Sequence, residues 1–239
     1  MGALRGVVAL DGPSGTGKTT VARTLADRLS AGYLDTGAMY RLVTLAVLRA
    51  GVEPTDAEAV AEVARRISYE IGTDPSAPRV SLGGEDVSAE IRGPEITHAV
   101  SPVSAVPKVR EFLVAEQRRI IQGVLESVGG VVVEGRDIGT VVTPDAPLKV
   151  FLTASAEIRA ARRSAQDSAA GRESTVDDAR ASVDRRDKLD SSRAASPLRA
   201  AEDAVEVDTT ELSIDQVIVA LSELACRRGL LDECTKAAP

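Results

Sequence analysis

The chain has 239 residues, which is room for one α/β domain of ordinary size, with or without a small insertion. Its formal net charge of −7 argues against a protein that binds nucleic acids or anionic membranes in bulk, because both need a basic face. Hydrophobic residues make up 44% of the chain, but aromatic residues only 2%, so the core must be built from alanine, valine, leucine and isoleucine.

The first predicted elements enclose a phosphate-binding loop. An apolar run at 7–11 predicts a buried parallel strand, and apolar residues at helical spacing predict a helix at 18–30. The pattern G-x-x-x-x-G-K-T between them lets backbone N–H groups point at an anion, while its lysine reaches the β- and γ-phosphates and its threonine reaches Mg²⁺. The residues expected to bind the donor nucleotide are Gly12, Pro13, Ser14, Gly15, Thr16, Gly17, Lys18, Thr19 and Thr20.

Such a loop occurs in GTPase switches, in motor ATPases and in small-molecule kinases. A switch usually carries Asn-Lys-x-Asp, and this chain contains no asparagine. A motor usually has an apolar strand that ends in Asp-Glu, whereas the run VVVEGRD ends in Glu134, Gly135, Arg136 and Asp137. A kinase must also hold an acceptor that carries its own negative charge. That requirement predicts arginines and anion-binding loops elsewhere in the chain.

A second helix start follows a short predicted strand at 33–35. Thr36 is expected to cap a helix at 38–50, and Arg41 lies about one turn further in. The free N–H groups of this helix start could face an anion. The alternative is that Thr36 is a simple cap and Arg41 a solvated surface residue.

The middle of the chain predicts a helix, a β-rich insertion and a second helix. The pattern Thr55-x-x-Glu58 is a capping box for the first helix, at 56–66. Two alternating runs within 68–92 predict a hairpin that turns at Gly83-Gly84. A long helix is expected at 108–127.

Two charged residues follow the next predicted strand, at 131–135. In open α/β sheets, ligands bind outside the carboxyl ends of the strands, so Arg136 and Asp137 are candidate site residues. The alternative is an ion pair between these two loop residues. Another strand is expected at 148–152.

An arginine-rich region follows, with a helix predicted at 155–166. Small and polar residues at 164–174 predict a mobile lid. The arginines at its edges are Arg159, Arg162, Arg163 and Arg172.

The helix predicted at 175–189 carries the last group of candidates. Spacings of four and three place Arg186, Asp190 and Arg193 on one side if the helix continues that far. The alternative is a solvated helix that is stabilised by ion pairs along its surface.

The C-terminal part predicts a strand at 204–208 and a helix at 214–228. Ser213-x-x-Gln216 is a capping box for this helix. The tail at 230–239 is expected to be disordered.

Cysteine and histidine give no metal-binding or redox pattern. Cys226 and Cys234 are expected to remain reduced, in the cytoplasm, and His98 is the single histidine. The N-terminal apolar run is too short for a signal peptide, and no run approaches the roughly 18 residues of a membrane span.

Several segments together resemble the bacterial cytidylate kinases, which are nucleoside monophosphate kinases. The segments are DGPSGTGKTTVA, YLDTGAMYR, GEDVSAEIR, GRDIGTVV, RRDKLDSSRAASPL and VDTTELSIDQVI. They occur in order and cover nearly the whole chain. The resemblance implies transfer of the ATP γ-phosphate to CMP or dCMP with Mg²⁺. It does not extend to the tail, and Thr36 stands where the family often has serine.

The resemblance also implies roles for individual residues. The residues expected around the acceptor phosphate are Thr36, Arg41, Arg136 and Arg193. The residues expected to read the cytosine edge are Ser101, Arg110 and Asp137, and those expected at the sugar are Arg186 and Asp190. Arg159, Arg162 and Arg163 are expected near the ATP phosphates. The transfer itself is expected to depend on Lys18, Arg136, Arg186 and Arg193.

The expected fold is an α/β P-loop kinase fold, a parallel sheet with helices on both faces. Residues 1–67 and 100–229 form the core with its lid, and 68–99 form an insertion that binds the acceptor nucleotide. A monomer that binds neither nucleic acid nor membrane is expected. Two rivals remain: a kinase for UMP, AMP or a metabolite hydroxyl, and a protein that binds partners in a nucleotide-dependent way without catalysis.

Overall fold

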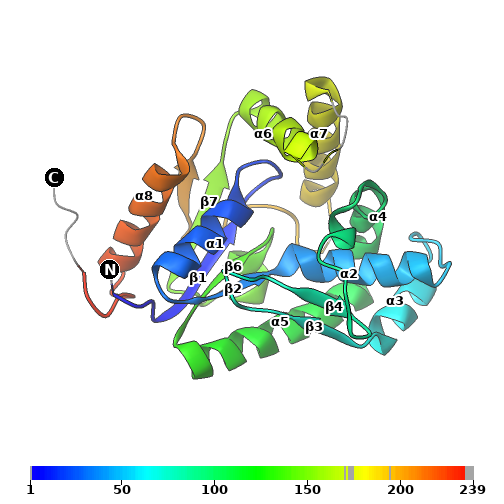
Figure 1. Ribbon diagram of the computed structural model, residues 1–239, viewed down its shortest axis with the longest axis horizontal. Helices are drawn as coiled ribbons and strands as arrows, with labels where there is room; N and C mark the ends of the chain where they lie inside the picture. The colour runs from blue at the N-terminus through cyan, green and yellow to red at the C-terminus, as the bar shows by residue number, and fades with distance from the viewer. Residues whose placement is uncertain (1, 170, 172–174, 194, 235–239) are drawn as a thin grey trace.

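A five-stranded parallel sheet forms the centre of the molecule (Figure 1). The computed structural model describes residues 2–169, 171, 175–193 and 195–234. In spatial order the strands are β2 (Gly32–Asp35), β6 (Gly130–Glu134), β1 (Gly6–Asp11), β7 (Leu148–Thr153) and β8 (Val205–Asp208). The expected parallel sheet is therefore confirmed, and β1 lies in its middle.

Helices cover both faces of this sheet because β1 is apolar on both sides. Val7 and Ala9 belong to one buried cluster, whereas Val8 and Leu10 belong to another on the opposite face. The helices that contribute to the first cluster are α2 (Thr36–Arg49), α3 (Ala57–Arg66), α4 (Pro94–Ala105) and α5 (Pro107–Val128), and those of the second are α1 (Lys18–Arg28) and α8 (Ile214–Arg227). Among the described residues, no helix is both long and apolar enough to cross a membrane.

Two helices differ from the sequence expectation. Helix α4 was not expected, because Pro102 inside it interrupts the pattern that marks a helix, although Pro94 suits its first turn. Helix α6 (Ala156–Ala169) runs three residues beyond its expected end, so the first part of the expected lid, 164–169, is helical. It packs against α7 (Val176–Ser191). The remainder of the expected lid, Arg172 included, lies largely outside the described residues.

Two of the three expected helix caps are wrong by one residue. Asp35 caps α2, because its Oδ1 accepts the Ala38 N–H at 2.9 Å, and Thr36 is already the first helical residue. Asp56, not Thr55, caps α3 in the same manner. In both places a carboxylate stands next to the hydroxyl and reaches the free N–H group instead. The capping box of Ser213 and Gln216 is confirmed.

The insertion is a small antiparallel sheet of β3 (Tyr69–Ile71), β4 (Val80–Leu82) and β5 (Glu85–Asp86). The expected hairpin is confirmed, because Gly83 and Gly84 connect β4 to β5 with φ of +59° and +85°. Val87 and Ile91 then bury themselves against Leu42 of α2. This contact fixes the insertion on the core beside the carboxyl end of β2.

The start and the end of the described chain lie side by side, so the expectation of a disordered tail is wrong for 230–234. Leu4 and Leu231 form an antiparallel bridge. The guanidinium of Arg5 donates to both carboxylate oxygens of Asp232, at 2.8 to 3.1 Å. Leu4 is fully buried, so the tail covers an apolar residue that would otherwise face water.

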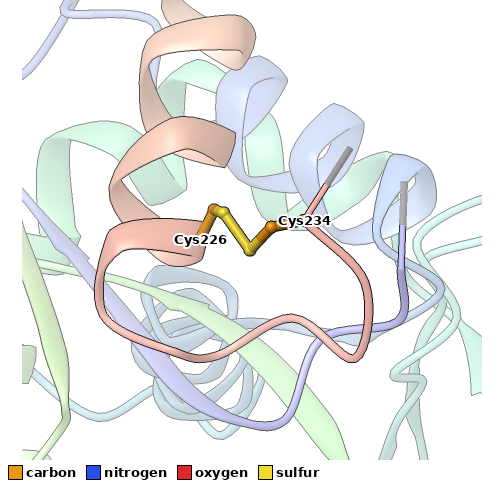
Figure 2. The surroundings of a disulfide bond; sticks show 2 residues. All are labelled: Cys226 and Cys234. Atoms are coloured by element: carbon orange, nitrogen blue, oxygen red, sulfur yellow. A yellow bond between two sulfur atoms is a disulfide. The ribbon is translucent and has the colours of Figure 1, made fainter. Parts of the chain in front are cut away.

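Cys226 and Cys234 form a disulfide, which corrects the expectation of reduced thiols (Figure 2). Helix α8 ends at Arg227, and Gly229, with φ of +69°, turns the chain back. The Cα atoms of the two cysteines thereby come within 5.6 Å of each other, a usual separation for a disulfide. The spacing in the sequence alone did not reveal this turn.

The packing of Leu4 predicts a stabilising role for the N-terminal segment. Leu4→Ala should lower the free energy of unfolding by about 2–5 kcal/mol, because it leaves a cavity in a fully buried site. Urea unfolding measures this. Val128→Ala, at a side chain 42% exposed, is the control and should change stability by less than about 0.5 kcal/mol. Equal effects of the two substitutions would contradict the packing role of Leu4.

Candidate functional site

The phosphate-binding loop connects β1 to α1, as expected, and close contacts require two of its glycines, Gly12 and Gly15. A Cβ atom on Gly12 would stand 2.2 Å from the carbonyl oxygen of Leu152 on the neighbouring strand. A Cβ atom on Gly15, whose φ is +82°, would stand 2.7 Å from the carbonyl oxygen of Arg159. The loop is therefore held between β7 and α6, and no larger residue fits at either position.

Lys18 lies buried under this loop. Its Nζ donates to the carbonyl oxygen of Pro13 at 2.6 Å. Burial lowers the pKa of Lys18 and Arg136 lowers it further, whereas nearby carboxylates, Glu134 first, oppose this shift. The ammonium group is thus placed where an additional anion would stabilise its charge.

Glu134 is a site residue that sequence reasoning missed. It ends β6, and its two carboxylate oxygens accept the Thr19 hydroxyl at 3.1 Å and the Tyr33 hydroxyl at 2.5 Å. Burial raises the pKa of Glu134 to about 7, and Asp35, its register partner on β2, contributes to the rise. An acidic residue after the apolar run VVV was a usable signal, but it was considered only as part of a motor signature.

A cavity next to the loop collects the expected acceptor residues. The nine residues Thr36, Arg41, Ser101, Arg110, Arg136, Asp137, Arg186, Asp190 and Arg193 all line it. They come from α2, α4, α5, α7 and the loops that follow β6 and α7. The structure therefore brings together every residue expected at the acceptor.

One end of this cavity is a buried ion pair. Arg110 and Asp137 are joined by a hydrogen bond, and both side chains are 6% exposed. The guanidinium of Arg110 lies over the ring of Tyr40, 5.3 Å from its centroid, and donates to the carbonyl oxygen of Ser104 at 3.1 Å. The alternative of an ion pair between Asp137 and Arg136 is not what the structure shows.

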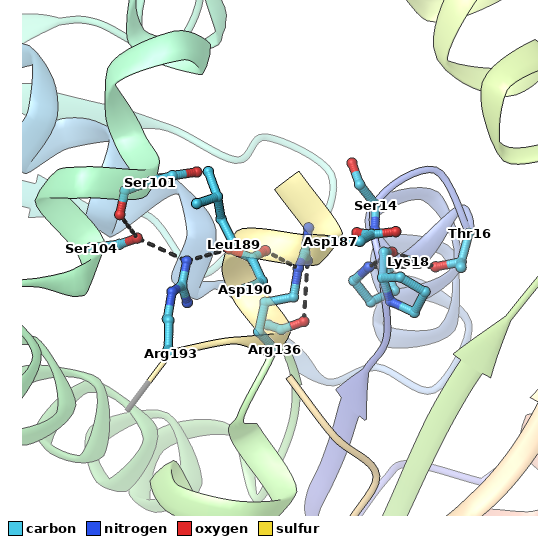
Figure 3. Close-up of polar contacts among 12 residues, drawn as sticks. Ser14, Thr16, Lys18, Ser101, Ser104, Arg136, Asp187, Leu189, Asp190 and Arg193 are labelled. Atoms are coloured by element: carbon cyan, nitrogen blue, oxygen red, sulfur yellow. Dashed lines mark hydrogen bonds and ion pairs between the residues drawn. The ribbon is translucent and has the colours of Figure 1, made fainter. Parts of the chain in front are cut away.

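The other end holds Asp190 together with Arg41, Arg136, Arg186 and Arg193. Figure 3 shows Asp190 with two of these arginines, Arg136 and Arg193. Asp190 accepts from Arg136 at 3.0 Å and is also hydrogen-bonded to Arg193. Burial alone would raise the pKa of Asp190, but the surrounding arginines hold it below its usual value. Burial lowers the pKa of Arg186 to about 10 and that of Arg41 to about 9, and neighbouring arginines lower both further. The positive charge here exceeds the negative charge, as in a site built for an anion.

Two hydroxyl groups support this arrangement. Thr36 donates to the carbonyl oxygen of Glu134 at 2.7 Å, which ties α2 to β6 beside the cavity. Ser104, which sequence reasoning missed, accepts from Arg193 at 2.9 Å and donates to the carbonyl oxygen of Ser101 at 3.0 Å. No local pattern marks Ser104, because it lies in the helix that was not expected.

The arginines of α6 differ in their contacts with the loop. Arg159 donates to the carbonyl oxygen of Ser14 at 3.1 Å. Arg162 donates to the main chain and hydroxyl of Thr209, and to the carbonyl oxygen of Thr16 at 3.4 Å. Arg163 instead pairs with Asp167 of its own helix at 3.0 Å. Arg159 and Arg162 therefore contact the phosphate-binding loop in this structure, whereas the contact described for Arg163 is with its own helix.

Comparison with known proteins gives matches over most of the chain. The family model described as cytidylate kinase matches residues 8–227. The protein named cytidylate kinase from Rhodococcus opacus is 59% identical over 212 residues, which are 89% of this chain and 91% of that protein. Its namesake from Nocardia farcinica is 58% identical over 222 residues, 93% of this chain and 94% of that protein.

A solved structure resembles the fold at lower identity. An uncharacterized protein from Eubacterium ventriosum superposes with a TM-score of 0.50 at 11% identity, over 93% of this chain and 99% of that one. At this identity the likeness concerns the fold alone.

Glu134 should make stability depend on pH. Its pKa is raised from 4.5 to about 7 on folding, so between these values the folded state binds more protons than the unfolded state. The contribution of this group to stability therefore falls as pH rises from about 4.5 to about 7. In the Glu134→Gln variant, which keeps an acceptor for Tyr33, the loss of stability across this pH range should become smaller. The part that remains is expected from Asp11, whose pKa burial raises to about 6.

The control for this measurement is Glu111→Gln, at an exposed carboxylate of α5. It should keep the pH profile of the unsubstituted protein. Parallel profiles for the unsubstituted protein and Glu134→Gln would contradict the raised pKa.

Proposed function

The chain belongs to the cytidylate kinase family, and we propose that it transfers the γ-phosphate of ATP to CMP or dCMP in the cavity beside the loop. The observation that carries this proposal is the excess of arginine over carboxylate in that cavity. Two polyanions must meet during the reaction, and the arginines of the cavity offset the repulsion between them. An ATP-dependent nucleoside monophosphate kinase needs this arrangement, and a protein that binds ATP alone does not.

The donor side is assigned to the loop and to α6. The loop amides hold the β- and γ-phosphates, and Lys18 stabilises the charge that develops on the transferred group. Arg159 and Arg162, which already contact the loop, complete this side. Arg163 can join them only after its pair with Asp167 opens.

Mg²⁺ fits the corner formed by Thr19 and Glu134. A hydroxyl and a carboxylate lie in contact there, and both are oxygen ligands of the kind that Mg²⁺ accepts. A cation would also relieve the buried negative charge that raises the pKa of Glu134. When bound, the ion supplies neutralisation of the phosphate charge.

The acceptor side is assigned by the charges of the cavity. We assign the cytosine edge to Ser101, Arg110 and Asp137, because a carboxylate accepts from the exocyclic amino group and a guanidinium donates to ring acceptors. The acceptor phosphate is assigned to Thr36, Arg41, Arg136 and Arg193, and the sugar to Arg186 and Asp190. The ionised phosphate oxygen attacks in line and needs no general base.

The insertion at 68–99 is proposed to support the acceptor side. Arg41 donates to the carbonyl oxygen of Ile91 at 3.0 Å and to the hydroxyl of Thr97 at 2.9 Å. The position of the arginine therefore depends on the insertion and on the first turns of α4. This is a physical reason for an insertion beside the site.

We also propose a monomeric enzyme of the cytoplasm. Size-exclusion chromatography with light scattering tests the first statement. The disulfide between Cys226 and Cys234 counts against the cytoplasmic location, since thiols in the cytoplasm are usually kept reduced.

A panel of acceptors tests the proposal. With ATP and Mg²⁺, formation of ADP should be fast with CMP and dCMP and slow with UMP, AMP and alcohols. Lys18→Ala should lower turnover by at least about 100-fold, because it removes a charge that acts on the transferred group. Its melting curve should stay close to that of the unsubstituted protein. A preference for another acceptor favours the rival kinase, and transfer to no acceptor favours the binding protein.

Asp137 should carry much of the base choice. Asp137→Asn should narrow the ratio of kcat/KM for CMP over UMP by roughly 5- to 150-fold, since an amide offers uracil a donor as well as an acceptor. The ratio is measured at saturating ATP. The control is Asp145→Asn, at an exposed residue, which should leave it within twofold. If the ratio for Asp137→Asn also stays within twofold, Asp137 does not read the base and serves only as the structural partner of Arg110.

A further inference from the structure

A carboxylate of helix α7 lies against the phosphate-binding loop. Asp187 Oδ1 accepts the backbone N–H of Ser14 at 2.9 Å. Ser14 stands within the glycine-rich loop, whose amides are the donors that such loops offer to phosphate. An anion supplied by the protein itself therefore uses one of the donors that a nucleotide would use.

A cation of the donor side is held by the same carboxylate. The other oxygen of Asp187 accepts from Arg159 Nη1, which also donates to the carbonyl oxygen of Ser14. The two side chains are 13% and 17% exposed, so water screens this pair only in part. Asp187 thus resembles a phosphate in its contacts: one loop amide and one arginine.

Because both carry negative charge, the carboxylate of Asp187 and a phosphate group cannot occupy the Ser14 amide together. Lys18 lies close enough for Asp187 to oppose the lowering of its pKa, so the carboxylate stands in the field of the same lysine that a phosphate would approach. Two anions on one amide repel each other strongly in a partly dry site. A phosphate group that binds to the Ser14 amide must therefore displace the carboxylate.

We propose that Asp187 is an internal competitor of the donor phosphates, which holds the Ser14 amide and Arg159 until a nucleotide replaces it. Asp187 is thereby a positioning residue that sets donor affinity, and this inference rests on the proposed use of the loop for ATP. Helix α7 also carries Asp190, which faces the acceptor arginines one turn away (Figure 3). The exchange of Asp187 for phosphate releases this helix from the donor loop.

The test is equilibrium binding without an acceptor, so that no transfer occurs. Calorimetry measures the dissociation constants of ATP with Mg²⁺ and of pyrophosphate. Asp187→Asn should bind both about tenfold more tightly than the unsubstituted protein, because the amide carries no charge and competes weakly. The matched control is Asp184→Asn, at a carboxylate 56% exposed on the same helix, which should stay within twofold.

The direction in which the dissociation constants change shows whether Asp187 competes with the phosphates or helps to bind them. If Asp187 merely holds Arg159 in place, Asp187→Asn weakens binding, and that result, or an unchanged constant, overturns the inference. Asp187→Ser provides a second variant if the first does not fold, and it too should tighten binding. Asp187→Glu keeps the charge and should lie closer to the unsubstituted protein. If the unsubstituted protein binds neither probe, the proposed function itself fails.

Discussion

The arrangement of the site depends on two hydrogen bonds that the carboxylate of Asp11 accepts. Asp11 ends β1 directly before Gly12, and its two carboxylate oxygens accept the N–H groups of Ile138 and Gly139 at 2.8 Å each. Burial raises the pKa of Asp11 to about 6, although these two hydrogen bonds oppose the rise. The donor loop follows this residue in the chain, and the acceptor loop after β6 is held by it in space. One buried carboxylate therefore sets the distance between the two loops.

Helix α7 contacts both the phosphate-binding loop and the arginines of the neighbouring cavity through two carboxylates. Asp187 and Asp190 are one turn apart, and the first holds Arg159 at the donor loop while the second holds Arg136 and Arg193 at the acceptor cavity. Without these carboxylates the arginines would repel one another in a partly dry environment. The same carboxylates hold the guanidinium groups in defined orientations.

The parts of the fold that could be predicted are those that a short contiguous stretch of sequence marks. The loop pattern and the apolar strands are contiguous, whereas the acceptor residues come from separate parts of the chain. Most of them were candidates because of their places at predicted helix starts, strand ends or helix faces, but Ser101 and Arg110 were found through resemblance alone. What was missed depends on distant partners: Glu134 meets a hydroxyl 115 residues away, Ser104 an arginine 89 away and Asp187 an amide 173 away. Periodicity and propensity carry no information about such contacts. The disulfide was missed for a related reason, since the turn at Gly229 decides it.

The first and the last described segments of the chain lie side by side. The N–H of Gly2 donates to the carbonyl oxygen of Glu233 at 3.1 Å, and both ends lie on the side away from α4 (Figure 1). Short linkers between neighbouring termini are what circular permutation requires. A circularly permuted sequence is therefore expected to form the same fold. A permuted chain opened at the exposed turn of Gly83 and Gly84 would keep every strand neighbour of the central sheet.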